Sequence, residues 1–430
     1  MTAAGPLWRA GERTGATQTP GRAVTTAPSG PVSGPWRFRS VALVLLAATL
    51  AGCGTASHDV TTSPAAERST APASPTPRSG SASPKSTPGP ARADSGRASE
   101  HDIYAADRPG MLSPAVASFP SRVYVPNSES DSVDVIDPKT YKIIDHFRTD
   151  RLPQHVVPSW DMKQLWVNNN IGNTLTPIDP KTGKPGKAIP VEDPYNLYFT
   201  PDGRTALVMA ERNNELDFRD PKTMRLLHSM PVPCRGINHA DFTADGSLFL
   251  ASCEFSGDLV VIDWQRRAMS KVIALGATSM PQDVKLSPDG TIFYVADMAK
   301  GGVWLVDAAT LKIIRFMPTG AGAHGLYVSR DSRVLYVSNR GAGSVSVVSF
   351  KEQKPIATWT IPGGGSPDMG GLTADGRELW LSGRYHGVVY VFSTVSGKLT
   401  HKINVGSGPH GLCVYPQPGR YSLGHTGIFR

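Results

Sequence analysis

A repeat of about 42 residues dominates the chain and most constrains how it can fold. One copy occupies residues 281–320 and reads PQDVKLSPDGTIFYVADMAKGGVWLVDAATLKIIRFMPTG. Its four short segments are rich in β-branched and aromatic residues and are bounded by Gly, Pro, Asp or Asn, which is the pattern of short antiparallel strands. The closing position of the turn after the first segment recurs at intervals of about 41 to 44 residues, at Met162, Gly203, Gly246, Gly290, Ser332, Gly376 and Pro418.

A second marker fixes the turn between the third and fourth segments. It reads IDPKT from residues 136 and 178 and RDPKT from residue 219, and later copies replace it with VIDWQ and LVDAAT. Asp followed by Pro favours a type I turn, so this marker indicates a hairpin. Repeats of this length with four strands each are propeller blades. The sequence therefore predicts an all-β fold, a seven-bladed β-propeller of four-stranded antiparallel blades.

The two ends of the repeat region are half-blades that complete each other. The repeat starts with VYVPN at residue 123, which matches a second strand, and finishes with GPHGLCVY at 408–415, which matches a first strand. We therefore expect the C-terminal strand to join strands 123–127, 132–136 and 141–147 in one sheet. Closing the ring in this way removes the exposed sheet edges that an open array would leave.

Residues 1–53 have the features of a secretion signal that ends in a lipid-attachment sequence. Arg37 and Arg39 precede the apolar run VALVLLAATLAGC, which is too short to cross a bilayer as a helix of the mature protein. The sequence LAGC that ends at Cys53 resembles a bacterial lipobox, in which the cysteine thiol is diacylated and becomes the new N-terminus. We expect lipidation of Cys53, with an ordinary secretion signal as the alternative.

Residues 54–120 form the predicted tether and lead-in, and residues 121–430 form the predicted propeller. Ser, Thr, Pro, Ala and Gly dominate the tether, so it cannot bury enough apolar surface to fold on its own. Its prolines keep it extended. The expected location is extracytoplasmic, with attachment to the membrane by lipid alone.

Charge and cysteine content narrow the classes of function. Residues 1–100 carry ten basic and five acidic residues, which leaves only +3 of the net charge of +8 for the rest of the chain. We therefore expect no nucleic-acid partner. The four cysteines form no CxxC or CxxCH motif, which excludes a zinc ribbon, a thioredoxin motif and a c-type haem. Cys234 and Cys253 flank one predicted hairpin and are the candidate disulfide, with two buried thiols as the alternative; Cys413 is expected to be a packed thiol.

Polar residues begin the first strand of each predicted blade, at one mouth of the central channel. Two consecutive positions form two rings: Gln154, Tyr195, Asn238, Gln282, His324, Asp368 and His410 in one, and His155, Asn196, His239, Asp283, Gly325, Met369 and Gly411 in the other. Imidazoles and carboxylates ligate metals, so the candidate metal or anionic-ligand site consists of His155, His239, His324, His410, Asp283 and Asp368. The alternative is that these side chains bond loop backbone and line a water-filled channel. No HExxH or GxSxG motif and no carboxylate pair indicates a reaction, so no catalytic residue is assigned.

Further polar residues follow the second strand of several blades. They are Asn168–Asn170, Asn339–Arg340 and Arg384–His386. The sequence does not fix the face of the propeller on which these loops lie, so a partner surface there stays open.

The repeat units resemble the YVTN-type β-propeller repeat. The likeness rests on LYVSNRGAGSVSVV (335–348), GLYVSRDSRVLYVSN (325–339) and KINVGSGPHGLCVYP (402–416), and it covers residues 123–418. The chain looks like the YncE-like group of secreted or surface propellers. The same repeat type is similar to haem d1-binding domains and lactonase-like propellers, and the Pro-His-Gly triplet 409–411 is common in YVTN repeats generally.

Together these features predict a lipid-anchored, extracytoplasmic and monomeric propeller that acts as a binding module for a small ligand or a cell-surface protein. The alternative is an enzyme or cofactor carrier, an oxidoreductase or a lactonase-like protein, that binds a metal or a tetrapyrrole through the histidine ring. No cofactor is assigned, although the histidine and carboxylate set would suit a metal.

Overall fold

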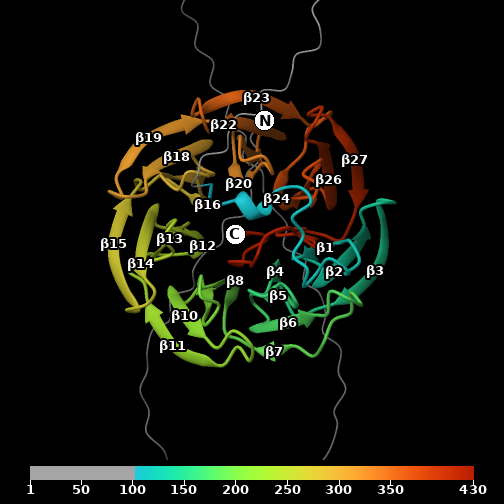
Figure 1. Cartoon of the computed structure of the whole chain (residues 1–430), viewed down its shortest axis with the longest axis horizontal. Coiled ribbons are helices and arrows are strands. Elements are labelled where there is room, and N and C mark those ends of the chain that lie inside the picture. The colour runs from blue at the N-terminus through green and yellow to red at the C-terminus, as the bar shows by residue number, and fades with distance from the viewer. Residues whose placement is uncertain (1–101) are drawn as a thin grey trace, which may run out of the picture. The chain divides into compact units, whose positions relative to one another are not determined.

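Seven four-stranded antiparallel sheets stand around one axis in the computed structural model, which describes residues 102–430 (Figure 1). This confirms the predicted seven-bladed propeller. The predicted signal, Cys53 and tether residues 54–101 lie outside the described residues. Within the described part of the chain, no helix is long and apolar enough to cross a membrane.

The blades follow one another along the chain, except that the last strand belongs to the first blade. From the channel outward, the strands are β28 (Cys413–Tyr415), β1 (Arg122–Asn127), β2 (Ser132–Asp137) and β3 (Lys142–Arg148) in blade I; β4 (Pro153–Pro158), β5 (Leu165–Asn169), β6 (Thr174–Ile178) and β7 (Ile189–Pro190) in blade II; β8 (Pro194–Phe199), β9 (Ala206–Ala210), β10 (Glu215–Arg219) and β11 (Leu226–Pro231) in blade III; β12 (Ile237–Phe242), β13 (Leu248–Cys253), β14 (Asp258–Asp263) and β15 (Ala268–Ala274) in blade IV; β16 (Pro281–Leu286), β17 (Ile292–Asp297), β18 (Gly302–Asp307) and β19 (Ile313–Pro318) in blade V; β20 (Ala323–Val328), β21 (Val334–Asn339), β22 (Ser344–Ser349) and β23 (Lys354–Thr360) in blade VI; and β24 (Pro367–Leu372), β25 (Glu378–Gly383), β26 (Val388–Ser393) and β27 (Leu399–Asn404) in blade VII.

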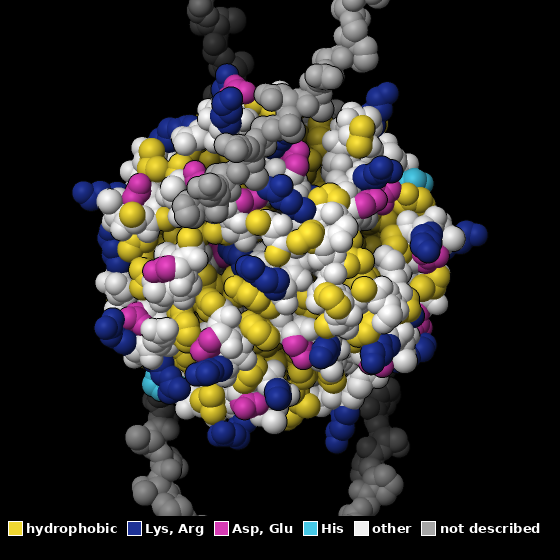
Figure 2. Space-filling model, in the orientation of Figure 1, with side chains coloured by type: hydrophobic (Ala, Val, Ile, Leu, Met, Phe, Trp, Pro, Cys, Tyr) yellow, Lys and Arg dark blue, Asp and Glu magenta, His cyan; other side chains and the backbone are white. Residues whose placement is uncertain are grey.

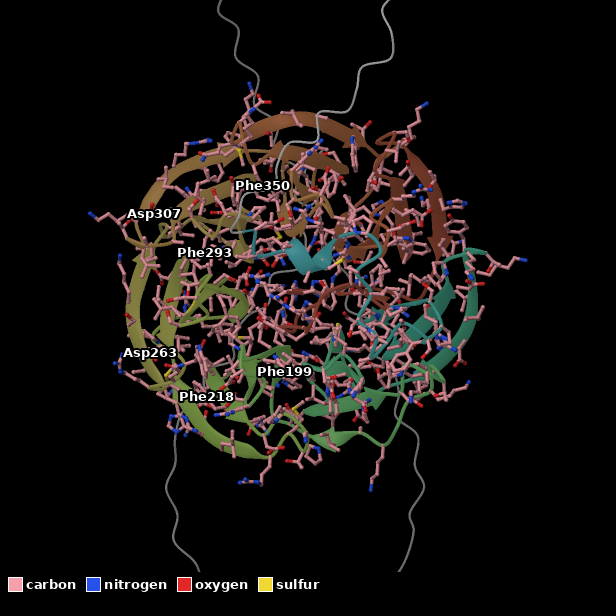
Figure 3. All side chains as sticks on the ribbon, in the orientation of Figure 1. Phe199, Phe218, Asp263, Phe293, Asp307 and Phe350 are labelled. Atoms are coloured by element: carbon pink, nitrogen blue, oxygen red, sulfur yellow. A yellow bond between two sulfur atoms is a disulfide. The ribbon has the colours of Figure 1, made fainter. Side chains whose placement is uncertain are left out.

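Burial decreases from the channel to the rim within each blade. First strands such as β16 are buried along their whole length, whereas fourth strands such as β23 are largely exposed. Neighbouring blades cover the inner strands on both faces, so these strands are buried along their length even where they carry polar residues, as in PQDVKL of β16. Phe218, labelled in Figure 3, belongs to a core cluster that joins blades III and IV.

Residues with positive φ close the turns between first and second strands. At Gly290 φ is +73°, and a Cβ there would lie 2.7 Å from the Cβ of Ala244, so this turn requires glycine. Met162 and Ser332 adopt the same conformation with φ of +58°. The seventh predicted turn position, Pro418, is not in such a turn, because the chain runs on from β28 into a C-terminal tail and proline cannot adopt positive φ.

Aspartates at the outer rim close the hairpins between third and fourth strands, as the second sequence marker predicts. Asp307 Oδ1 accepts a hydrogen bond of 2.7 Å from the backbone N–H of Thr310. Asp263 Oδ1 accepts one of 2.9 Å from Arg266. Both aspartates lie at the edge of the ring in Figure 3.

The C-terminal strand closes the ring, as predicted from the two half-blades. β28 pairs antiparallel with β1, with Cys413 opposite Tyr124 and Val414 opposite Val123. The strand is shorter than the predicted segment 408–415, because the bulged start of an inner strand pairs irregularly. Elsewhere, Cys234 and Cys253 form a disulfide with a Cα–Cα distance of 5.9 Å, and Cys413 is a buried thiol.

Both ends of the described chain close the channel on the face that carries the turns between first and second strands, here called the turn face. The 3-10 helix η1 (Ala105–Asp107) is drawn over the axis in Figure 1, with the C-terminus beside it. Tyr104 Oη donates 2.9 Å to the Leu286 carbonyl. Arg430 Nη2 donates 2.7 Å to Asp241 Oδ1, and its guanidinium lies 4.6 Å from the Tyr104 ring centre. Side chains fill the uncovered middle of the face shown in Figure 2.

Candidate functional site in the channel

A β-bulge at the start of the inner strand exposes the two ring positions to the channel. In blade IV the pairing of β12 with β13 shifts between Ile237 and Ala240, which flank Asn238 and His239. The same shift recurs at the start of β4, β16, β20 and β24, whereas in β8 the shift between Pro194 and Asn196 leaves only Tyr195 unpaired. A bulge leaves residues unpaired and redirects their side chains. The backbone irregularity therefore brings the two predicted rings together.

The four predicted histidines and a fifth pack ring against ring in the channel. The His155 ring centre lies 5.4 Å from that of His239 and 4.8 Å from that of His410, and His324 lies 5.7 Å from His410. His425 of the C-terminal tail lies 5.3 Å from His155 and 5.0 Å from His239. All five side chains are buried. The sequence pattern missed His425, because the tail belongs to no repeat and has no register that would place it.

His324, Asp368 and His410 form one group, with ligand atoms within 4.8 Å of one another. Asp368 Oδ1 accepts hydrogen bonds of 3.0 and 2.6 Å from Arg340 and lies 3.1 Å from His324 Nδ1. Asp368 Oδ2 lies 3.6 Å from His410 Nε2. The carboxylate of this group is thus already paired with a guanidinium.

His155, His239 and His425 form a second group, again with ligand atoms within 4.8 Å of one another. Burial holds the pKa of all three imidazoles well below the usual 6.5, so they are neutral at neutral pH. Both nitrogens of His239, and Nε2 of His155 and of His425, have no hydrogen-bond partner among the described residues. Buried polar atoms without partners are rare, so this group calls for an explanation.

Asp283, the remaining predicted site residue, serves mainly the backbone. Its Oδ1 accepts a hydrogen bond of 2.9 Å from the N–H of Val284, and its Oδ2 accepts one of 2.9 Å from the N–H of Leu326 in the next blade. Oδ1 also lies 3.6 Å from His425 Nε2. These contacts agree with the alternative in which the polar ring residues form hydrogen bonds with the backbone.

The residues that directly follow the second strands surround the channel mouth opposite the turn face, here called the loop face. The N–H of Arg340 donates 2.8 Å to the Gly322 carbonyl, and that of Glu254 donates 2.9 Å to Gly236. Gly322 and Gly236 immediately precede the inner strands of the same blades, so the two loops lie side by side. These contacts place the loops that follow the second strands on the loop face, which the sequence did not determine. The set comprises Ser128, Asn170, Glu211, Glu254, Met298, Arg340 and Arg384.

Two acidic and two basic members of this set influence the pKa of the Tyr195 phenol. Burial raises the pKa of Tyr195 well above 10; Glu211 and Glu254 raise it further, whereas Arg384 and Arg340 lower it. The two glutamates belong to adjacent blades III and IV, and the two arginines to adjacent blades VI and VII. The mouth is therefore acidic on one side and basic on the other.

Glu211 is a nearly buried carboxylate without a counter-charge in contact. It is 8% exposed and makes no hydrogen bond or ion pair in the described part of the chain. Burial, then the charges of Glu254 and Asp193, raise its pKa well above 4.5, and Arg212 opposes them. Glu254, in contrast, accepts 2.9 Å from Asn238 Nδ2.

Contact between the imidazoles leaves no room for a tetrapyrrole at this level of the channel. A macrocycle inserted between neighbouring rings would have to separate centres that are 4.8 to 5.9 Å apart. Interiors packed in this way do not open without cost. A tetrapyrrole therefore cannot lie between these rings unless they move apart.

The fold and the site define a seven-bladed β-propeller whose channel is closed on one face and polar at the other mouth. The chain belongs to the YNCE-like beta-propeller family, which matches residues 106–419. This confirms the predicted YncE-like membership.

Individual relatives are distant. The chain is similar to "Uncharacterized protein YncE" of Salmonella typhi, with 22% identity over 277 residues, 57% of this chain and 73% of that protein. Among solved structures it resembles Kuenenia stuttgartiensis hydrazine synthase (TM-score 0.56, 19% identity, 64% of this chain and 92% of that chain). It also resembles a functionally unknown protein of Desulfotomaculum acetoxidans (TM-score 0.59, 15% identity, 68% of this chain and 98% of that chain). A third similar structure is dihydro-heme d1 dehydrogenase NirN in complex with DHE (TM-score 0.53, 15% identity, 71% of this chain and 76% of that chain). At these identities the likeness shows the fold alone.

Proposed function

We propose that this protein is a lipid-anchored, extracytoplasmic and monomeric binding module. Its ligand is a small molecule with one cationic and one anionic group, held at the loop-face mouth of the channel. The opposing charges around Tyr195 support this proposal, and so does the closed turn face, which makes the channel a blind one. No group in the described channel is assigned a catalytic step.

The observation that carries the proposal is the unpaired carboxylate of Glu211. Burial raises the pKa of Glu211 well above 4.5, because the charged form has no counter-charge in contact, and a cation bound beside it would stabilise that charged form. A ligand ammonium would supply the missing donors and counter-charge. Glu254 on the adjacent blade offers a second carboxylate to the same cation.

Arg384 is the group that would receive the anionic end. Its Nη1 donates 2.8 Å to Ser128 Oγ and 3.1 Å to the Gly408 carbonyl, which hold the guanidinium at the mouth. Its Nε and Nη2 have no hydrogen-bond partner within residues 102–430. A guanidinium binds carboxylate through two parallel hydrogen bonds, so this free edge suits a carboxylate or a similar oxyanion.

The location rests on the signal, the lipobox and the tether, all outside the described residues. The disulfide between Cys234 and Cys253 supports an oxidising compartment, since structural disulfides persist outside the cytoplasm.

The test is calorimetric titration with alanylalanine, N-acetyl-alanylalanine and alanylalanine amide. The unmodified dipeptide should bind, and removing either of its charges should weaken binding about tenfold or more, as expected for a charged hydrogen bond. Glu211→Gln and Arg384→Gln should do the same, whereas the exposed control Arg204→Gln should not. Equal affinity for the three dipeptides, or no binding of any, would contradict the proposal.

A further inference from the structure

We infer that His155, His239 and His425 form a binding site for a single divalent transition metal ion of the zinc and copper class. This site lies among side chains different from those of the proposed mouth ligand, and it stands independently of that ligand. The three histidines come from β4, from β12 and from the C-terminal tail.

The tail holds His425 in a fixed position. The N–H of His425 donates 2.8 Å to the Leu197 carbonyl, and the N–H of Phe199 donates 2.9 Å to the Leu423 carbonyl. Both pairs join the tail to β8, the inner strand of blade III. His425 is therefore as well positioned as the two histidines on the propeller strands, and three imidazoles converge from three separate parts of the chain.

The hydrogen bonds of His155 and the freedom of His239 leave lone pairs available. The Nδ1–H of His155 donates 3.0 Å to the Tyr195 carbonyl, which leaves the lone pair on Nε2, the atom without a partner. A backbone carbonyl in this position is the usual support for a metal-binding histidine. Neither nitrogen of His239 is bonded, so either tautomer offers one lone pair.

The spacing is close to that of a metal centre. Zn–N bonds of about 2.0–2.1 Å in a tetrahedron place nitrogens about 3.4 Å apart. The ligand atoms here lie within 4.8 Å of one another, so the nitrogens would have to approach by up to about 1.4 Å when a metal ion binds. Water, or Asp283 Oδ1 at 3.6 Å from His425 Nε2, is available for the fourth position.

Hydrogen bonding favours this group over the one formed by His324, Asp368 and His410. In that group the carboxylate is already bonded to Arg340. In the described part of the chain no guanidinium bonds to the three histidines of the proposed site, and the cation that acts on two of them is the buried Lys285, whose charge lowers the pKa of His239 and His425. Neutral imidazoles are the ligands that zinc, copper and nickel prefer, which sets the class of metal.

Asn196 adjusts the third ligand. Its amide Nδ2 lies 3.0 Å from His425 Nδ1, which places the ring proton on Nε2 in the metal-free protein. Coordination through Nε2 requires the amide to turn, so that its oxygen leaves the Leu197 N–H, from which it now accepts at 2.9 Å, and accepts from Nδ1–H instead. A carboxylate at this position would favour that tautomer permanently, so Asn196→Asp should tighten metal binding about tenfold, the scale of such supporting partners.

The experiment titrates the purified, chelator-treated protein with Zn²⁺, Cu²⁺ and Co²⁺ and follows the ligand-field spectrum of Co²⁺. We expect one ion per chain, a four-coordinate Co²⁺ spectrum and a higher melting temperature with Zn²⁺. His239→Asn and His425→Asn should each lower the affinity about a hundredfold, and the exposed control His228→Asn should not change it.

Several outcomes would overturn the inference. They are no stoichiometric binding, full affinity in folded His239→Asn, or loss of binding in His410→Asn instead, which would place the ion in the other group. If the histidine variants do not fold, the metal affinity of Asn196→Asp is the deciding measurement. An affinity equal to that of the unmodified protein would also contradict the proposed site. Titration of alanylalanine with and without Zn²⁺ measures binding at the mouth separately. Failure of the metal site can therefore be distinguished from failure of the proposed mouth ligand.

Discussion

Replacing Arg430 by methionine should destabilise the propeller by about 3 kcal/mol. Arg430 is 7% exposed and bonds Asp241 at 2.7 Å, so its removal leaves a buried carboxylate without a counter-charge, at a cost of about 3–5 kcal/mol. Asp241 keeps two backbone donors, the N–H groups of Phe242 at 2.8 Å and Leu286 at 2.9 Å, which places the loss at the lower end. Methionine retains apolar packing against Tyr104.

The assay is equilibrium urea unfolding followed by tryptophan fluorescence, with midpoints compared at constant slope. The double variant Arg430→Met/Asp241→Asn should recover most of the loss, because the two charges are then removed together. Arg204→Met, exposed in a turn on the same face, is the matched control. A change below about 1 kcal/mol in Arg430→Met, or strictly additive losses in the double variant, would refute the view that this ion pair holds the tail.

Three further predictions concern the anchor, the disulfide and the mouth. Cys53→Ser should release the protein from membranes into the soluble fraction, and continued membrane retention would show that the cysteine is not lipidated. Cys234→Ser/Cys253→Ser should lose about 3 kcal/mol of unfolding free energy, the scale expected for a bridge that spans 19 residues, as measured by denaturant unfolding under oxidising conditions. Because the pKa of Glu211 is raised, a cationic ligand must displace its proton at low pH; affinity for alanylalanine should rise with pH through that raised pKa and level off above it. Glu211→Gln should flatten this profile, and a pH dependence that survives the substitution would assign it to another group.

The strand pattern was predictable because the backbone geometry of each turn requires particular residues, which can be recognised in the sequence. Gly290 closes a turn that tolerates no Cβ, and Asp307 caps a hairpin through the N–H of Thr310. Such local rules repeat in each copy, so the number of blades and the closure by the last strand follow from counting. The polar rings followed from the same register, because equivalent positions of a repeat occupy equivalent positions in space.

The completed site was less predictable, because its decisive residues lie outside the repeat register. His425 reaches the channel through backbone bonds to β8 that no local pattern encodes. The charges of Glu211 and Arg384 occupy equivalent positions in different blades, but only the paired loops show that these positions share the mouth. Tyr104 precedes the first strand, and its place over the axis depends on Arg430 at the far end of the chain.

Closure by β28 also sets the order in which this protein can be made. A chain leaves the ribosome or a translocation channel N-terminus first, and blade I has only three strands until Tyr415 has emerged. His425 emerges ten residues later still. A chain that ends before β28 thus carries neither a sealed ring nor the full set of histidines. Ring closure and assembly of the site are therefore both late steps, and the site is completed only after the ring can close.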